Sequence, residues 1–328
     1  MSKNNKALVT GGSGFIGSHL IEALLREGWE VRALVRETSS RERLDRRGLE
    51  LAVGDLTEKG SLEKSLGGVA AIFHLAGRIK ARSRDEYFRT NWLGTKNLLE
   101  AAAERAGDLR QFIYVSSLSA AGPSPDGHPL TEEEEARPVS LYGESKLAAE
   151  REAERFSDRL PIAVLRPAAV YGPRDAETLQ VIKLARWGVR FRPGRADNIF
   201  SAVHVADLVD AILRAAENST PEFRAYFIGD GNKYSWRETF DLLAAVLGKK
   251  SFSLTVPWEP ARAGVRLLAG LFPRSPAAFY LDKIGEMSHN YWVCNISRAR
   301  KELGFNPRYD LNRGLRETVD WYRTKGWL

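Results

Sequence analysis

Residues 6–17 of the chain read Lys6-Ala7-Leu8-Val9-Thr10-Gly11-Gly12-Ser13-Gly14-Phe15-Ile16-Gly17. This stretch has the pattern of a buried strand, a glycine-rich turn and the start of a helix. Gly11 allows a tight turn, Gly14 lets a pyrophosphate approach the backbone, and Gly17 lets the helix pack closely on the strand. Because free N–H groups and the helix dipole favour a phosphate there, the stretch predicts a dinucleotide-binding turn.

The first two-thirds of the chain alternates runs rich in Val, Ile and Leu with stretches of helical period, which is typical of βαβ units. Helices are predicted at Ser18–Glu27 and Thr95–Arg105. Strands are predicted at residues 6–10, 30–35, 50–53, 70–75, 111–116, 162–166 and 225–228. We therefore expect an α/β fold: a Rossmann-type doubly wound parallel sheet of about seven strands, with a smaller mixed C-terminal substrate lobe.

The clean alternation ends after residue 167, where residues 168–200, 231–260 and 261–295 are predicted to form helices and long loops. We expect an NAD(P)-binding domain at residues 1–167, with contributions from segments near 199–230, and a substrate-binding lobe mainly in residues 168–328. The acidic run Glu132–Glu135 follows a turn-rich stretch and is predicted to be a solvated surface loop.

Composition narrows the possible partners. The 328 residues carry a formal charge of +7, which favours anionic ligands. The only cysteine, Cys294, fits a reducing compartment, and no signal peptide or membrane-spanning run is evident, so we expect a cytoplasmic protein without stable membrane insertion. The five histidines are scattered, and we predict no metal site.

The second predicted strand ends at Val35 and Arg36, where an acidic residue would instead accept hydrogen bonds from the ribose 2′-OH of NAD. A cation at this place suits a 2′-phosphate, and Ser39, Arg41 and Arg43 are close in sequence. The sequence therefore favours NADP(H) as the cofactor. NAD(H) is the alternative, because Arg36 could also be an ordinary surface residue at a strand end.

Tyr142 and Lys146 are separated by one helical turn at the start of a helical stretch, so their side chains can share one pocket. A lysine cation near a phenol is expected to lower its pKa and to suit it to exchange a proton with an alcohol or carbonyl oxygen. The fifth strand ends in Ser116 and Ser117 at the edge where ligands bind. We favour Ser117 as the hydrogen-bond donor to the substrate oxygen, while Ser116 could cap a turn.

Over nearly its whole length the chain resembles the extended short-chain dehydrogenase/reductase family. The motifs that carry the resemblance are Thr10-Gly11-x-x-Gly14-x-x-Gly17, Gly54-Asp55-Leu56, His74-Leu75-Ala76-Gly77, Asn91-x-x-Gly94-Thr95, Tyr142-x-x-x-Lys146, Arg166-Pro167-x-x-Val170-Tyr171-Gly172-Pro173 and Gly314-Leu315-x-x-Thr318-Val319-x-Trp321-Tyr322. Each motif alone has a plain structural explanation, and only the set points to this family.

The resemblance implies roles for individual residues. The residues implied to bind the cofactor are Gly11, Gly14, Phe15, Ile16, Gly17, Arg36, Asp55, Leu56, Leu75, Ala76, Gly77, Tyr142, Lys146, Pro167 and Val170. Within this set Asp55 and Leu56 would flank the adenine, and Pro167 and Val170 would lie near the nicotinamide. Lys146 would also hold the nicotinamide ribose, Asn91 would support the proton relay, and the family implies a homodimer.

One departure separates branches of the family. Nucleotide-sugar enzymes commonly carry Asn where this chain has Ala169, whose methyl group cannot hydrogen-bond. The segment resembles the 3β-hydroxysteroid dehydrogenase and dihydroflavonol reductase branch, and Ser119, Ala169 and Arg174 are expected at the substrate. The apolar residues of 256–272 could cover a hydrophobic substrate, or they could be ordinary core.

Three readings remain open from the sequence. We favour an oxidoreductase that interconverts a secondary alcohol and a ketone on a hydrophobic, steroid- or flavonoid-like molecule. The alternative is an NAD-dependent nucleotide-sugar epimerase or dehydratase, in which Arg174 and the arginines of 186–195 would neutralise a pyrophosphate. A non-catalytic nucleotide sensor or RNA-binding protein could use the basic stretch of residues 78–89, but we expect a small-molecule substrate and no nucleic acid.

Overall fold

The computed structural model describes residues 5–45, 48–105, 109–193, 198–218, 223–249, 252–256, 263–264 and 277–328. Its centre is a seven-stranded sheet with the strand order β11-β6-β5-β4-β1-β2-β3, in which every neighbouring pair is parallel. The strands are β1 (Lys6–Thr10), β2 (Glu30–Val35), β3 (Leu49–Val53), β4 (Ala71–His74), β5 (Gln111–Val115), β6 (Ile162–Pro167) and β11 (Arg224–Ile228). The predicted parallel sheet of seven strands is confirmed.

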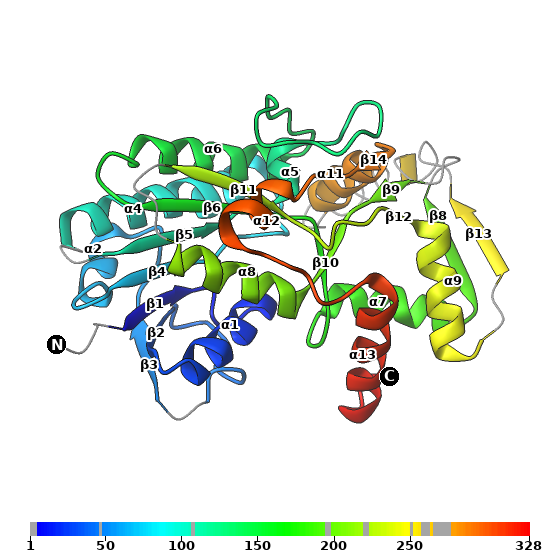
Figure 1. Ribbon diagram of the computed structural model, residues 1–328, viewed down its shortest axis with the longest axis horizontal. Helices are drawn as coiled ribbons and strands as arrows, with labels where there is room; N and C mark the ends of the chain where they lie inside the picture. The colour runs from blue at the N-terminus through cyan, green and yellow to red at the C-terminus, as the bar shows by residue number, and fades with distance from the viewer. Residues whose placement is uncertain are drawn as a thin grey trace.

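Helices cover both faces of this sheet (Figure 1). The helices of this part are α1 (Phe15–Arg26), α2 (Lys59–Leu62), η1 (Glu63–Ser65), α3 (Arg84–Phe88), η2 (Arg89–Leu93), α4 (Gly94–Arg105), α5 (Leu118–Ala121), α6 (Leu141–Arg155), α8 (Val205–Glu217) and α12 (Ser297–Leu303). Helix α1 begins at Phe15 and not at the predicted Ser18, because Gly14 at the end of the turn already serves as its N-cap.

The sheet is apolar on both sides because its side chains alternate between two cores. In β1, Ala7 and Val9 pack with α1 and α8, whereas Leu8 packs with α4 and α6 on the other face. The same alternation holds along β4 and β5. A parallel sheet covered on both faces requires this continuous apolar sequence.

The remaining elements form the smaller lobe. They are β7 (Ala169–Tyr171), α7 (Ala176–Arg186), β8 (Val189–Pro193), β9 (Ile199–Phe200), β10 (Ala202–His204), β12 (Tyr234–Ser235), α9 (Trp236–Leu247), β13 (Phe252–Val256), α11 (Ala277–Met287), β14 (Tyr291–Trp292) and α13 (Leu311–Thr324). A third core, which includes Phe240, Leu315 and Tyr322, holds α7, α9 and α13 together. The smaller mixed lobe is confirmed, but the short strands within the stretches predicted as helices and long loops, many of only two or three residues, were missed.

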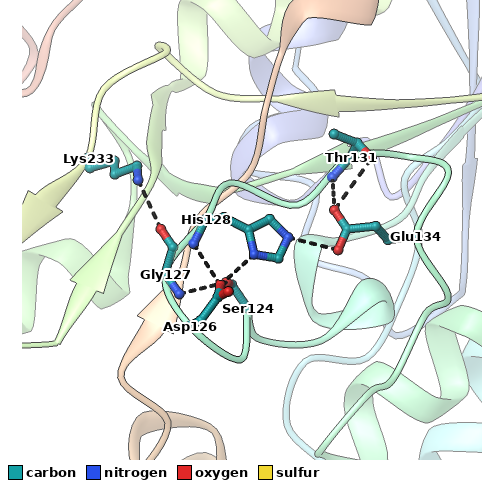
Figure 2. Close-up of polar contacts among 7 residues, drawn as sticks. All are labelled: Ser124, Asp126, Gly127, His128, Thr131, Glu134 and Lys233. Atoms are coloured by element: carbon teal, nitrogen blue, oxygen red, sulfur yellow. Dashed lines mark hydrogen bonds and ion pairs between the residues drawn. The ribbon is translucent and has the colours of Figure 1, made fainter.

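The loop between α5 and α6 is more ordered than a solvated loop. His128 contacts Asp126 through Nδ1 at 2.5 Å and Glu134 through Nε2 at 2.9 Å, and Lys233 donates to the Gly127 carbonyl at 2.9 Å (Figure 2). Glu132 is turned inward and accepts from the Phe227 backbone N–H at 2.7 Å. Glu132 therefore fastens the loop to the sheet edge, which corrects our expectation of a solvated segment at this residue, whereas the side chains of Glu133 and Glu135 are 67% and 76% exposed, as expected.

No helix within the described ranges has the length and apolar character needed to cross a bilayer. The apolar segment that we expected to cover the substrate lies mostly in residues 257–262 and 265–276, outside the described residues.

We predict that the buried ion pair between β6 and α6 is costly to break from one side. Arg166 makes hydrogen bonds of 2.6 to 3.2 Å to Glu150, and their side chains are 10% and 4% exposed. Arg166→Met would leave the carboxylate buried without its partner and should lower the free energy of unfolding by about 3–5 kcal/mol. Urea unfolding measures this loss.

The double variant Arg166→Met, Glu150→Leu removes both charges and should recover most of the lost stability. A double variant as unstable as the single one would contradict this account.

Candidate functional site

The glycine turn joins β1 to α1 and is shaped by close backbone contacts. Gly11 has φ +73°, and a Cβ there would lie 2.7 Å from the Ala76 nitrogen. A Cβ at Gly17 would lie 2.2 Å from the Gly11 carbonyl oxygen, so the helix can pack against the turn only with glycine here. Gly14 caps α1 without a side-chain hydrogen bond, and the first helical turn has no acidic residue. The N–H groups at this helix end are therefore available to an anionic ligand.

A cavity of about 760 Å³ opens beside this turn, at the carboxyl edge of β1, β2 and β4. The strand order reverses between β1 and β4, and ligands of open α/β sheets bind at such a switch point. Most of the cofactor residues expected from the sequence line the cavity, namely Gly11, Gly14, Arg36, Asp55, Leu56, Leu75, Ala76 and Gly77. Phe15, Ile16 and Gly17 form the first turn of α1.

The residues around this cavity fit a dinucleotide. The outward N–H groups of α1 suit its phosphates, and Leu34 and Leu56 offer apolar surface for a base. Asp55 is held in place, since its Oδ1 accepts from the Thr57 N–H at 2.8 Å and its own N–H donates to Ser61 at 2.8 Å. At the end of β2, Arg36 and Ser39 line the wall together, whereas Arg43 donates to the Arg174 carbonyl at 3.3 Å.

A buried chain of hydrogen bonds connects the strand ends to the helices behind the cavity. The Ala76 N–H donates to Thr10 Oγ1 at 3.2 Å, and Thr10 Oγ1 contacts His74 Nδ1 at 2.6 Å. His74 Nε2 contacts Thr95 Oγ1 at 2.8 Å, and Thr95 donates to the Asn91 carbonyl at 2.6 Å. Each threonine hydroxyl has one proton to donate. Because Thr95 donates its proton to the Asn91 carbonyl, it must accept from His74 Nε2–H, and Nδ1 must then accept from the Thr10 hydroxyl.

The imidazole of His74 is fully buried, which lowers its pKa to about 3, with the Lys146 charge as a second cause. The imidazole therefore stays neutral at physiological pH. The hydrogen-bond chain requires this, because Nδ1 must be free of a proton to accept from Thr10. The sequence presented His74 only as part of a motif, and its role depends on partners that lie far away in the chain.

The predicted catalytic side chains come together at the carboxyl edge of β5. Tyr142 and Lys146 lie on α6, and the Tyr142 hydroxyl is hydrogen-bonded to Ser117. Ser117 also caps α5 by accepting from the Ser119 N–H at 3.1 Å. The turn is thus capped by Ser117 and not by Ser116, whose Oγ is buried with no hydrogen-bond partner among the described residues.

Lys146 is buried and donates from Nζ to the Val115 carbonyl at 2.8 Å, above the Tyr114 ring. Burial lowers its pKa to about 7, partly offset by the charge of Glu150. A Cβ at Gly77 would lie 3.7 Å from this Nζ, so the ammonium group lies behind the cavity wall.

The expectation that Lys146 lowers the pKa of the Tyr142 phenol is not met in this state of the protein. Burial raises the pKa of Tyr142 above its usual value, the charge of Glu286 raises it further, and the hydrogen bond from Ser117 opposes both. The physical reason is that the phenol is withdrawn from water, while Lys146 directs its ammonium group to a backbone carbonyl.

Asn91 lies in η2, a π-helical turn, and such turns recur at functional sites. Its Oδ1 accepts from the Arg78 N–H at 2.6 Å, and its Nδ2 donates to the Arg78 carbonyl at 3.1 Å and to Ser145 Oγ at 2.9 Å. The Asn91 side chain therefore connects the cavity wall after β4 to the catalytic helix. The sequence predicted a part in the proton relay for Asn91 and did not predict this connection.

The expected substrate residues are more dispersed. Ser119 lies in the first turn of α5, and its carbonyl packs against Gly143 of the catalytic helix. Ala169 is exposed at the start of β7, after Pro167 at the end of β6. Arg174 is directed toward α1, where it donates to Glu22 at 2.6 Å and to Ser18 at 3.3 Å. Val170 packs against the sheet core.

The basic stretch after β4 is largely engaged in ion pairs. Arg78 pairs with Glu86 at 3.4 Å, Lys80 with Glu177 at 2.5 Å, and Arg84 with Glu144 at 3.2 Å. These pairs engage three of the cations in this stretch. In the second basic cluster, residues 194–197 lie outside the described residues. No group of three His, Cys, Asp or Glu side chains suited to a metal occurs among the described residues.

Two further residues at the site were missed from the sequence. Asp282 of α11 accepts from the Leu141 and Tyr142 N–H groups at 2.7 and 3.3 Å. Glu286, one turn later, accepts from Ser140 Oγ at 2.7 Å. The only signal was two carboxylates spaced one helical turn apart, some 140 residues beyond the helix that they contact.

Comparisons with known proteins agree with this geometry. The model of the NAD dependent epimerase/dehydratase family matches residues 7–229. The chain is 33% identical to a ceramide reductase of Caulobacter vibrioides, covering 98% of this chain and 95% of that protein. It is 32% identical to a 4-hydroxy-2-methyl-3-oxo-4-farnesyl-3,4-dihydroquinoline-1-oxide ketoreductase of Stigmatella aurantiaca, covering 94% of each. Among solved structures, a UDP-glucose 4-epimerase of Thermus thermophilus in complex with NAD superposes with a TM-score of 0.77 at 26% identity, covering 97% of this chain and 99% of that one.

We predict that Lys146 gives the cofactor-free protein a distinct pH dependence of stability. In the window between its folded pKa of about 7 and its ordinary 10.5, the unfolded chain binds a proton that the folded one lacks. The free energy of unfolding should therefore rise with pH in this window, by up to about 1.4 kcal/mol per pH unit. In Lys146→Met this contribution should vanish, as measured by urea unfolding at several pH values. The exposed Lys64→Met is the charge-matched control, and an equal slope in Lys146→Met and wild type would refute the assignment.

Proposed function

We propose that this protein reduces a ketone on a hydrophobic substrate, with NADP(H) as the preferred cofactor. The chain belongs to the NAD-dependent epimerase/dehydratase family, and it is an NAD(P)-dependent oxidoreductase of the extended short-chain type. The observation that carries this proposal is the hydrogen-bonded pair of Tyr142 and Ser117, with Lys146 one helical turn away and behind the cavity wall.

The side chains divide the chemistry between them. The nicotinamide, when bound, supplies or accepts the hydride. Ser117 donates a hydrogen bond to the substrate oxygen, and Tyr142 exchanges the proton with that oxygen. Lys146, one helical turn from Tyr142, can stabilise the phenolate left after proton transfer if its protonated Nζ turns from the Val115 carbonyl to the phenol. Asn91 keeps the cavity wall at Arg78 in register with α6.

The cofactor preference rests on the end of β2. Arg36 and Ser39 both line the cavity, and β2 ends without the carboxylate that would accept from a ribose 2′-OH. An exposed guanidinium next to a serine hydroxyl suits a 2′-phosphate, because a phosphate accepts hydrogen bonds from both. NADP(H) is therefore proposed over NAD(H).

The substrate class rests on Ala169 and on the relatives. Ala169 offers no hydrogen bond to a sugar nucleotide, and Arg174 is engaged with Glu22 rather than available to a pyrophosphate. The named relatives include reductases of a ceramide and of a farnesylated quinoline oxide. A bulky lipid-like ketone is the proposed substrate, bound between the catalytic edge and the lobe.

A nucleotide-sugar epimerase is the second candidate, favoured by the likeness to UDP-glucose 4-epimerase over nearly the whole chain. The same Tyr142 and Lys146 would then begin a transient oxidation. The two candidates differ in whether free cofactor is consumed.

We predict that the purified protein consumes NADPH with members of a panel of hydrophobic ketones. Tyr142→Phe removes the proton donor and should lower kcat by about 10²–10⁴-fold, while NADPH binding, followed by its fluorescence, stays close to wild type. Tyr280→Phe, at a tyrosine that is 51% exposed, is the matched control. Turnover of a UDP-sugar with no net change in nicotinamide would refute the proposal.

We predict that Arg36→Glu reverses the cofactor preference. A carboxylate here repels a 2′-phosphate and can accept from a 2′-OH, so KM for NADPH should rise by about 10–100-fold while KM for NADH falls. Arg41→Glu makes the same charge change nearby, but Arg41 is not among the cavity residues, so its effect should be small. Equal effects of the two variants would point to a general surface field instead of a 2′-phosphate contact.

A further inference from the structure

The catalytic helix is docked onto the substrate lobe through two carboxylates. Asp282 and Glu286 lie one turn apart on α11, and both face the N-terminus of α6. Asp282 accepts from the backbone N–H of Leu141 and of Tyr142 itself, and Glu286 accepts from Ser140, the N-cap residue. Glu286 is only 6% exposed. This contact joins the lobe directly to the turn that carries the catalytic hydroxyl.

These contacts occupy the donors of the first helical turn. Ser140 Oγ accepts from the Gly143 N–H at 3.0 Å, and the Glu144 N–H bonds to the Ser140 carbonyl at 2.8 Å. With Leu141 and Tyr142 bonded to Asp282, the positive end of the α6 dipole faces a carboxylate rather than the phenol. The N-terminus of α1, by contrast, has no acidic residue in its first turn and is left for an anion.

Several charged and titratable groups face this region from other elements. Tyr87 of α3 lies 6.2 Å from the Tyr142 ring, and Lys146 follows one turn along α6. Lys283 bonds to Glu286 at 3.0 Å, but its side chain is 54% exposed, so water screens its charge. Burial first, and then the Glu286 charge, raise the pKa of Tyr142, while the hydrogen bond with Ser117 opposes them.

Resting on the proposed function, we infer that Asp282 and Glu286 are positioning residues that fix the first turn of the catalytic helix, and that the negative charge of Glu286 also keeps the Tyr142 hydroxyl in the protonated form that carbonyl reduction needs. In that direction the bound cofactor would supply a hydride to the carbonyl carbon, while the C=O π electrons move to the oxygen. The oxygen takes the proton of Tyr142, and the phenolate is reprotonated from water. The ketone is reduced to the alcohol, and NADPH is oxidised to NADP⁺.

The test is the pH profile of ketone reduction by Glu286→Gln. Losing the negative charge makes the phenolate less unfavourable, so the alkaline limb of kcat/KM should move to lower pH by about one unit. KM for NADPH should not change, because the carboxylates face the start of α6 and not the cofactor turn. Titration of ring-labelled tyrosine by NMR in the cofactor-free protein, with the Tyr142 signal assigned from Tyr142→Phe, should shift in the same direction.

Matched variants separate charge from folding. Glu144→Gln removes a carboxylate of α6 itself that pairs with Arg84 and should leave the limb in place. Glu286→Asp keeps the charge and should restore most of the profile. If Glu286→Gln does not fold, Asp282→Ala tests the other contact, because losing the acceptor of the Leu141 and Tyr142 N–H groups should lower kcat for ketone reduction without moving the limb.

The outcomes distinguish this inference from the proposed function. If Tyr142→Phe abolishes ketone reduction but Glu286→Gln leaves both the limb and the phenol titration unchanged, or Asp282→Ala leaves kcat unchanged, the inference is overturned and the proposed function stands. If Tyr142→Phe remains fully active, both are overturned.

Discussion

The buried hydrogen-bond chain from Ala76 through Thr10, His74 and Thr95 to Asn91 is the interaction on which the site depends. It joins the ends of β1 and β4 to the π-helical turn that carries Asn91. The strand order of the sheet reverses between these two strands. A cavity forms there because the helices that follow the two strands lie on opposite faces of the sheet. Polar groups at such a buried place need partners, and this chain gives each of them one.

The π-helical turn that carries Asn91 also contacts the catalytic helix α6. The backbone of Asn91 ends the buried chain, while its side chain binds Arg78 of the cavity wall and Ser145 of α6. From the other side, Asp282 and Glu286 hold the beginning of α6. Tyr142 is thus located by the sheet, the cavity wall and the lobe together, which explains how one hydroxyl is kept close to Ser117.

The sequence predicted what is encoded locally. The glycine turn, the strands of the large sheet and the position of Tyr142 and Lys146 on one helix follow from short-range patterns, and the structure agrees with them. The short strands of the lobe could not be predicted, because two or three residues show no period and their partners are distant; β9, for example, pairs with both β12 and β14. The direction of the Tyr142 pKa shift was also inaccessible, since it depends on burial and on Glu286 of a remote helix.

The path of the chain between sheet and lobe limits how the two parts can be exchanged. After β6 the chain enters the lobe, returns through α8 and β11 to complete the sheet edge, and leaves again for α9 (Figure 1). The chain then returns to the sheet once more through α12 before it ends in α13 of the lobe. The lobe is therefore three segments, separated by α8 with β11 and by α12. A single-crossover chimera with a related enzyme that is joined between β6 and β11 would mix parents within the sheet, whereas a new substrate lobe could be grafted only as three coordinated segments that also preserve α11 against α6.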